Sequence, residues 1–172
     1  MSHIRTKQLV TMGVLVALEI VLSRFLSFNA WNLKIGFSFV PVALAAILYG
    51  PLPAGVVAAL GDFLGAILFP IGPYFPGFTL TALLTGIVYG LFLRKKQTPP
   101  RIIGAVAVNQ LVLSLLLNSF WISVLYSSPF RPLLVTRAAQ CAILIPVQLA
   151  IIFAVARIKT RFPAFQEGGT AK

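Results

Sequence analysis

Four ionisable side chains lie inside otherwise apolar stretches of this sequence: Glu19, Arg24, Asp62 and Arg137. An ionised group at the centre of a membrane helix costs about 2.5–3.5 kcal/mol on insertion scales, so such residues pair with one another or face a polar interior. Pairing would explain them without a ligand. However, a carboxylate can also accept two parallel N–H bonds from an amino-substituted ring, and an arginine fork binds a carboxylate. Because a paired residue can still contact a ligand, both explanations stay open.

Polar side chains also form two stripes at helical spacing. The first stripe consists of Gln110, Ser114, Asn118 and Trp121, and the second of Arg137, Gln140, Leu144 and Gln148. Residues three or four apart share one face of a helix. Hydrogen bonds between helices would account for both stripes. Because both stripes climb toward the end where non-helical loops lie, we predict a polar pocket at that end.

Most of the aromatic residues lie in or beside the same loops, namely Phe25, Phe28, Trp31, Phe37, Phe39, Phe69, Tyr74, Phe75, Phe78, Phe120, Trp121, Tyr126 and Phe130. An interfacial belt enriches Trp and Tyr at both membrane surfaces, and it explains neither the asymmetry nor the dominance of Phe. A flat ligand stacked between rings explains both. Basic groups at this end (Arg24, Lys34, Arg131 and Arg137) favour a negatively charged ligand. Folate, with its pterin ring and glutamate tail, has these features.

The composition predicts an integral membrane protein as the scaffold. Hydrophobic residues make up 59% of the 172 and charged residues 10%, against roughly 25% charged residues in soluble domains. We predict an all-α bundle of six transmembrane helices in one domain, residues 1–172, with helices at about 7–28, 37–49, 54–69, 78–93, 102–125 and 133–156. The second, third and fourth are short for a span of about 20 residues, so we expect them to be tilted, re-entrant or sheltered.

The net charge of +11 follows the positive-inside pattern. Basic residues gather before the first span, at 94–101 between the fourth and fifth, and after the sixth. Both termini are therefore expected in the cytoplasm, and the loops at 29–36 and 70–77 outside. No basic stripe with interleaved aromatics indicates nucleic acid.

The sequence contains few residues that could carry out catalysis. The single histidine is His3, the single cysteine is Cys141, and acidic residues number three. The chain has no phosphate-binding glycine loop followed by Lys and Ser or Thr, so we expect no ATP hydrolysis. We predict that the protein is not an enzyme and holds neither metal nor cofactor.

Several motifs resemble the folate-specific substrate-binding (S) component of energy-coupling factor (ECF) transporters. They are residues 36–41 (GFSFVP), 49–51 (YGP), 61–65 (GDFLG) and above all 69–79 (FPIGPYFPGFT). The resemblance implies a vitamin-binding subunit of the bacterial plasma membrane. Its partners would be one transmembrane coupling protein and two cytoplasmic ATPases. The family docks the coupling protein on small residues of the first helix, a pattern that Gly13 and Ala17 match.

We therefore predict a high-affinity folate-binding subunit that captures its ligand at the outer face. The predicted ligand-binding residues are Arg24, Trp31, Asn32, Phe37, Phe39, Asp62, Tyr74, Phe75, Asn118, Trp121, Arg137 and Gln140. A binding subunit for another vitamin and a stand-alone small-molecule carrier are the alternatives.

Overall fold

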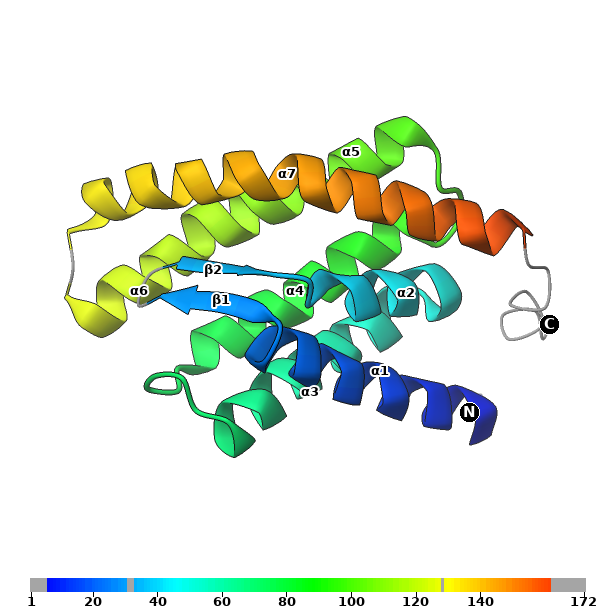
Figure 1. Cartoon of the computed structure of the whole chain (residues 1–172), viewed down its shortest axis with the longest axis horizontal. Coiled ribbons are helices and arrows are strands. Elements are labelled where there is room, and N and C mark those ends of the chain that lie inside the picture. The colour runs from blue at the N-terminus through cyan, green and yellow to red at the C-terminus, as the bar shows by residue number, and fades with distance from the viewer. Residues whose placement is uncertain (1–5, 31–32, 128, 162–172) are drawn as a thin grey trace.

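The computed structural model describes residues 6–30, 33–127 and 129–161. In chain order its elements are α1 (Thr6–Arg24), β1 (Ser27–Ala30), β2 (Leu33–Gly36), α2 (Phe39–Tyr49), α3 (Pro51–Leu68), α4 (Pro76–Leu93), α5 (Pro99–Ala107), the π-helix η1 (Val108–Leu117), α6 (Asn118–Tyr126) and α7 (Phe130–Arg161). Because α5, η1 and α6 follow one another without a break, the described residues form a bundle of six helices with one short hairpin (Figure 1). The predicted all-α, six-helix architecture is confirmed.

Five of these helices are long and apolar enough to cross a bilayer: α1, α3, α4, the continuous α5–η1–α6 and α7. The remaining helix, α2, has only 11 residues. It is sheltered, because most of its side chains are buried against α1, α3, α4 and α7. A helix too short to span is tolerated in a membrane protein when its neighbours cover its ends.

Proline begins three of the helices. Pro51, Pro76 and Pro99 stand in the first turns of α3, α4 and α5, each two or three residues before the predicted start. All three prolines lie outside the helices predicted from the sequence, which begin at about residues 54, 78 and 102. In the first turn, however, the missing N–H would have no partner anyway, and the fixed φ already suits a helix.

The first helix ends earlier than predicted, at Arg24, and an antiparallel hairpin follows it. Ser27 pairs with Gly36 and Ala30 with Leu33, in the stretch expected to be an outer loop. The Ser27 hydroxyl donates to the Leu22 carbonyl (2.7 Å) and so satisfies a backbone acceptor of the last helical turn. Strand pairing then satisfies the backbone of the non-helical segment where little water is available.

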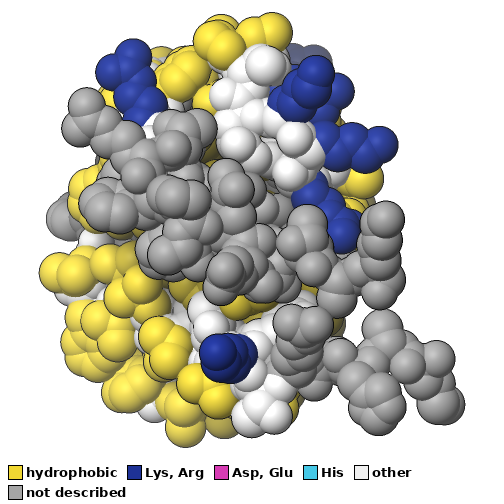
Figure 2. All heavy atoms as spheres, turned by 90° about the vertical axis from the view of Figure 1, so that its right-hand side faces the viewer, with side chains coloured by type: hydrophobic (Ala, Val, Ile, Leu, Met, Phe, Trp, Pro, Cys, Tyr) yellow, Lys and Arg dark blue, Asp and Glu magenta, His cyan; other side chains and the backbone are white. Residues whose placement is uncertain are grey.

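The two ends of the bundle differ in charge. α1 begins and α7 ends at the same end, which we call the basic end (Figure 1). Its exposed cations are Lys7, Arg94, Lys95, Lys96 and Arg157. Figure 2 looks onto this face, and among its described residues no acidic side chain is visible. By the positive-inside rule the basic end faces the cytoplasm. We call the opposite end, where α3 stops and α4 starts, the loop end.

The apolar core lies toward the basic end, where Leu93, Ile102, Val106 and Ile152 have at most 1% of their surface exposed. Glycines bring α3 and α4 into close contact beside it. A Cβ at Gly86 would overlap the Ala54 carbonyl group. Close approach through small residues is how membrane helices gain van der Waals contact without a hydrophobic driving force.

We expect Gly86→Ala to destabilise the protein by about 1–3 kcal/mol, because the added methyl must push two backbones apart. The matched control is Gly13→Ala, since no atom lies within 4 Å of a Cβ built at Gly13. Thermal unfolding in detergent measures both. Equal midpoints for the two variants would contradict the close α3–α4 contact.

Candidate functional site

A cavity of about 560 Å³ penetrates the bundle from the loop end. Its walls come from α1, α2, α3, α4, η1, α6 and α7, and residues 71–75 contribute to its mouth. Pockets for small organic ligands occupy about 300–1,000 Å³. The cavity is therefore large enough for a drug-sized molecule.

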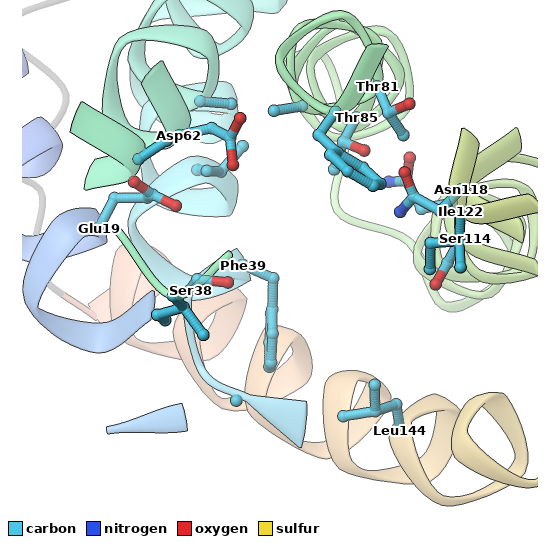
Figure 3. A pocket seen from close by; sticks show the side chains of 18 of the residues that line it. Glu19, Ser38, Phe39, Asp62, Thr81, Thr85, Ser114, Asn118, Ile122 and Leu144 are labelled. Carbon is cyan, nitrogen blue, oxygen red and sulfur yellow. The ribbon is translucent and has the colours of Figure 1, made fainter. Parts of the chain in front are cut away.

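One wall carries two carboxyl groups. Glu19 on α1 and Asp62 on α3, the two acidic residues among those described, both line the cavity, and Figure 3 shows their carboxylates on the same side of it. Glycines on α3 make this arrangement possible. A Cβ at Gly61 would overlap the Glu19 carboxylate, and one at Gly65 would lie 2.8 Å from Nε of Arg24. The α1–α3 interface thus holds polar side chains where two apolar helices would normally pack.

A chain of hydroxyl groups holds the Asp62 carboxylate. Thr79 Oγ1 on α4 donates to Asp62 Oδ2 at 2.9 Å, and the Tyr74 hydroxyl lies 3.2 Å from Thr79 Oγ1. Arg24 donates to the main-chain carbonyl of Asp62 (3.4 Å). No described residue binds the second carboxylate oxygen of Asp62, which is therefore available to a ligand donor.

The opposite wall is built from amides and hydroxyls. Figure 3 shows Ser114 and Asn118 with Thr81 and Thr85 across the cavity from Glu19 and Asp62. Asn109 and Gln110 line the cavity as well. Their turn is π-helical, with i→i+5 hydrogen bonds. A π-helical turn holds more than four residues. Gln110 and Asn109, which are four and five residues before Ser114, therefore both lie on the same side of the helix as Ser114.

Side chains of α4 and α7 close the inner part of this wall. The Tyr89 hydroxyl donates to Gln148 Oε1 at 3.0 Å. On α7, Arg137 Nη2 donates to the Ser114 carbonyl at 3.1 Å and Cys141 Sγ to the Gln110 carbonyl at 3.3 Å. These four side chains are buried. The amide wall is thereby tied to both neighbouring helices.

Aromatic rings line the cavity nearer its mouth. Phe75 packs against Trp121 with ring centroids 5.5 Å apart, and Trp121 Nε1 donates to Thr81 Oγ1 at 3.1 Å. Gly77 leaves room for both rings, since its Cβ would lie 2.6 Å from each. Phe39 projects into the cavity from α2 (Figure 3). Phe39 and Phe75 offer apolar faces to a flat ligand.

The structure brings most of the predicted site residues together. Those that line the cavity are Arg24, Phe39, Asp62, Tyr74, Phe75, Asn118, Arg137 and Gln140. Trp121 packs against Phe75 but does not line the cavity. Phe37, two residues before α2 begins, is exposed and does not line it either. Trp31 and Asn32 lie outside the described residues.

Other cavity residues were not among the predicted ligand contacts, including Glu19, Ser38, Thr81, Thr85, Tyr89, Asn109, Gln110, Ser114 and Gln148. The signal for three of them was present in the sequence, because Thr81, Thr85 and Tyr89 are spaced four residues apart on one helix face. Four others had been noted as polar or ionisable but not assigned to the site: Glu19, Gln110, Ser114 and Gln148. Asn109 had no such signal, since α-helical spacing places it well away from the Ser114 face.

The predicted docking residues lie on the outer face of α1. Gly13 and Ala17 are exposed, whereas Leu15, Glu19 and Ser23 on the other face are buried. Around the two small residues Leu9, Val10, Val14 and Leu18 are exposed too. This surface is apolar, and its centre is formed by the two small residues.

Comparisons with known proteins agree with these features. The family model described as "ECF transporter, substrate-specific component" matches residues 7–156. The folate transporter FolT of Clostridium novyi (strain NT) is 39% identical over 146 residues, which cover 84% of this chain and 85% of that protein. The riboflavin transporter RibU of Staphylococcus aureus (strain TCH60) is 35% identical over 137 residues, 74% of this chain and 71% of that protein. A crystal structure of FolT bound with folic acid is similar with a TM-score of 0.84 and 36% identity, over 88% of this chain and 93% of that one.

We expect Tyr89→Phe to lower the free energy of unfolding by about 1–3 kcal/mol, because the buried Gln148 oxygen would lose its donor. Adding Gln148→Leu should recover part of the loss, since no orphaned acceptor then remains. Thermal unfolding of both variants, with Tyr49→Phe at the basic end as control, checks the pair. A double variant less stable than Tyr89→Phe would contradict the expectation.

Proposed function

The chain belongs to the substrate-specific components of ECF transporters, and we propose that the ligand it captures is folate. The protein is a multi-pass membrane subunit that binds a transport substrate and is not an enzyme. As a member of this family it works with an energy-coupling module.

The observation that carries the folate proposal is the 0.84 TM-score to FolT bound with folic acid, together with 39% identity to a second FolT. The chemistry of the cavity supports it. Folate combines a flat heterocycle bearing neighbouring N–H groups with a dianionic glutamate tail. The cavity offers Phe39 and Phe75 for stacking and Asp62 as an acceptor of N–H groups, while Arg24 near its mouth suits a carboxylate.

Asp62 is the acceptor best placed for the heterocycle. Thr79 binds only Oδ2 of its carboxylate, and two parallel N–H groups of a pterin would complete its hydrogen bonds. Arg24, which ends α1 at the loop end, would bind the glutamate tail. Ligand enters from outside, because the basic end is closed by the apolar core.

Another vitamin is the alternative, since a riboflavin transporter is also similar. Competition between folic acid and riboflavin for the purified subunit separates the two ligands. Tight folic acid binding that excess riboflavin does not displace supports our proposal, and the reverse order refutes it. Binding without uptake when the coupling module is missing would also exclude a stand-alone carrier.

We expect Asp62→Asn to weaken folic acid binding about ten- to hundredfold, because hydrogen bonds to a charged group contribute about 1.5–3 kcal/mol. Asparagine keeps the size of the side chain but presents one N–H₂ group to the ligand's own donors. Titration of the purified protein measures the dissociation constant, with Arg101→Gln at the basic end as control. Unchanged folic acid affinity would remove Asp62 from the site.

We further propose that the coupling module, a transmembrane protein with two cytoplasmic ATPases, docks on the exposed face of α1 around Gly13 and Ala17. These small residues let a partner helix approach closely. The surrounding side chains are apolar and exposed, as a contact within the bilayer requires. The ligand cavity lies on the other side of the same helix, so docking leaves it unobstructed.

Gly13→Leu should leave folic acid binding to the isolated subunit unchanged and lower module-dependent uptake about tenfold, since overpacking a helix contact costs about 1–3 kcal/mol. The matched control is Ala142→Leu, which adds the same side chain to an exposed position on α7. Radiolabelled folate uptake by cells that express the module measures the difference. Full uptake by the Gly13 variant would place the docking surface elsewhere.

A further inference from the structure

The π-helical segment η1 carries polar atoms that the described residues do not satisfy. Both side-chain polar atoms of Asn109 and the side-chain oxygen of Gln110 are buried without a hydrogen-bond partner there. The two residues are 5% and 4% exposed and both line the cavity. The Tyr89 hydroxyl lies beside Asn109 but donates to Gln148 instead.

A buried amide without a hydrogen-bond partner is costly inside a membrane protein, because the surrounding hydrocarbon cannot form the hydrogen bonds that water would form. Native proteins keep few of them, and those that persist call for an explanation such as a ligand. Here two consecutive residues share the feature, and both face the cavity. Their position therefore indicates a hydrogen-bonding subsite for the ligand.

The π geometry is what gives one cavity wall two neighbouring amides. In an α-helix, residues 109 and 110 would point about 100° apart, and only Gln110 would share a face with Ser114. The wider turn of η1 brings Asn109 onto that face as well. Isolated π-helical turns are rare and often occur at functional sites.

Helix α7 holds η1 in this geometry. Arg137 donates to the main-chain carbonyl of Ser114 and Cys141 to that of Gln110. Both accepting residues belong to η1, four positions apart. A side chain that binds main-chain carbonyls of the π segment fixes where the amides of that segment point.

We propose that Asn109 and Gln110 bind the hydrogen-bonding edge of the ligand's heterocycle, with Cys141 and Arg137 as positioning residues. This inference rests on the proposed folate function. Asp62 accepts the N–H groups of the pterin, which leaves the ring carbonyl and ring nitrogens as acceptors. An Asn109 amide can donate to them, and the Gln110 oxygen can accept from the remaining N–H.

The charge distribution assigns this subsite to the heterocycle rather than to the glutamate tail. Asn109 comes three residues after the core residue Val106 and lies at the inner end of the cavity, beside core residues that are fully buried. Moving a dianion to such a place is far more costly than moving a neutral ring. The ring therefore enters first, and the tail stays near Arg24 and the mouth.

The test uses folic acid and its two fragments, pterin and p-aminobenzoylglutamate, as ligands of the purified full-length subunit. In Asn109→Leu and Gln110→Met, which keep the size of the side chain, folic acid and pterin should each bind about tenfold more weakly, as expected for the loss of a buried hydrogen bond. Competition by p-aminobenzoylglutamate should not change, because this fragment lacks the heterocycle. Equal losses for both fragments, or no loss for pterin, would overturn the proposal.

Failure of this inference is distinguishable from failure of the folate function. A wild-type protein that does not bind folic acid refutes the function. If the wild type binds folic acid and the variants bind folic acid and pterin with unchanged affinity, only the subsite is refuted. If Asn109→Leu does not fold, Asn109→Ser replaces it, because a smaller polar side chain is accommodated without overpacking. Loss of pterin affinity is expected there too, and unchanged pterin affinity would refute the subsite.

The positioning role of Cys141 has its own readout. Cys141→Ala should weaken pterin binding about two- to fivefold, in line with the small contribution of a thiol hydrogen bond. Cys141→Ser keeps a donor at the same place and should restore the wild-type value. If Cys141→Ala and Cys141→Ser change pterin affinity equally, the thiol does not act as a donor. The same conclusion follows if p-aminobenzoylglutamate affinity falls as much as pterin affinity.

Discussion

The structure depends on one constraint, namely that a polar group inside a bilayer must find its partner in the protein or in a bound molecule. This chain meets it by directing the polar side chains of its spans toward one cavity. Glu19, Asp62 and the amides of η1 come from different helices, yet all of them line the same space. The lipid-facing surfaces remain apolar, and most of the exposed Lys and Arg side chains lie at the basic end.

Glycines turn this constraint into a specific shape. Gly61 and Gly65 give α3 a surface on which the side chains of Glu19 and Arg24 can lie, and Gly86 draws α4 close to α3. Two apolar helices are thereby held together around buried charges. The glycine spacing consequently decides where the acidic wall lies, and with it which face of the cavity can accept N–H groups from a ligand.

Periodicity in the sequence predicted those parts of the site that obey α-helical geometry. Asn118, Arg137 and Gln140 follow that spacing and line the cavity. Asn109 could not be found in this way, because its place depends on a π-turn, and the sequence carries no rule for where such a turn forms. The hairpin after Arg24 escaped prediction for a similar reason, since its pairing depends on neighbours that only the folded bundle supplies. Trp121 shows the opposite error, because it shares the spacing of the stripe but packs against Phe75 and does not line the cavity.

The same helix serves both surfaces of the molecule. On α1, Gly13 and Ala17 face outward, whereas Glu19 and Ser23 face the interior, so the two stripes occupy different sides of one rigid element. The buried side is held by Glu19 and Arg24 on the glycines of α3, which fixes how α1 can rotate or slide. An apolar helix held only by dispersion contacts would have no such anchor. The charges that face the cavity therefore also set the orientation of the outer face, and the geometry of ligand capture and the geometry of docking are linked through the placement of α1.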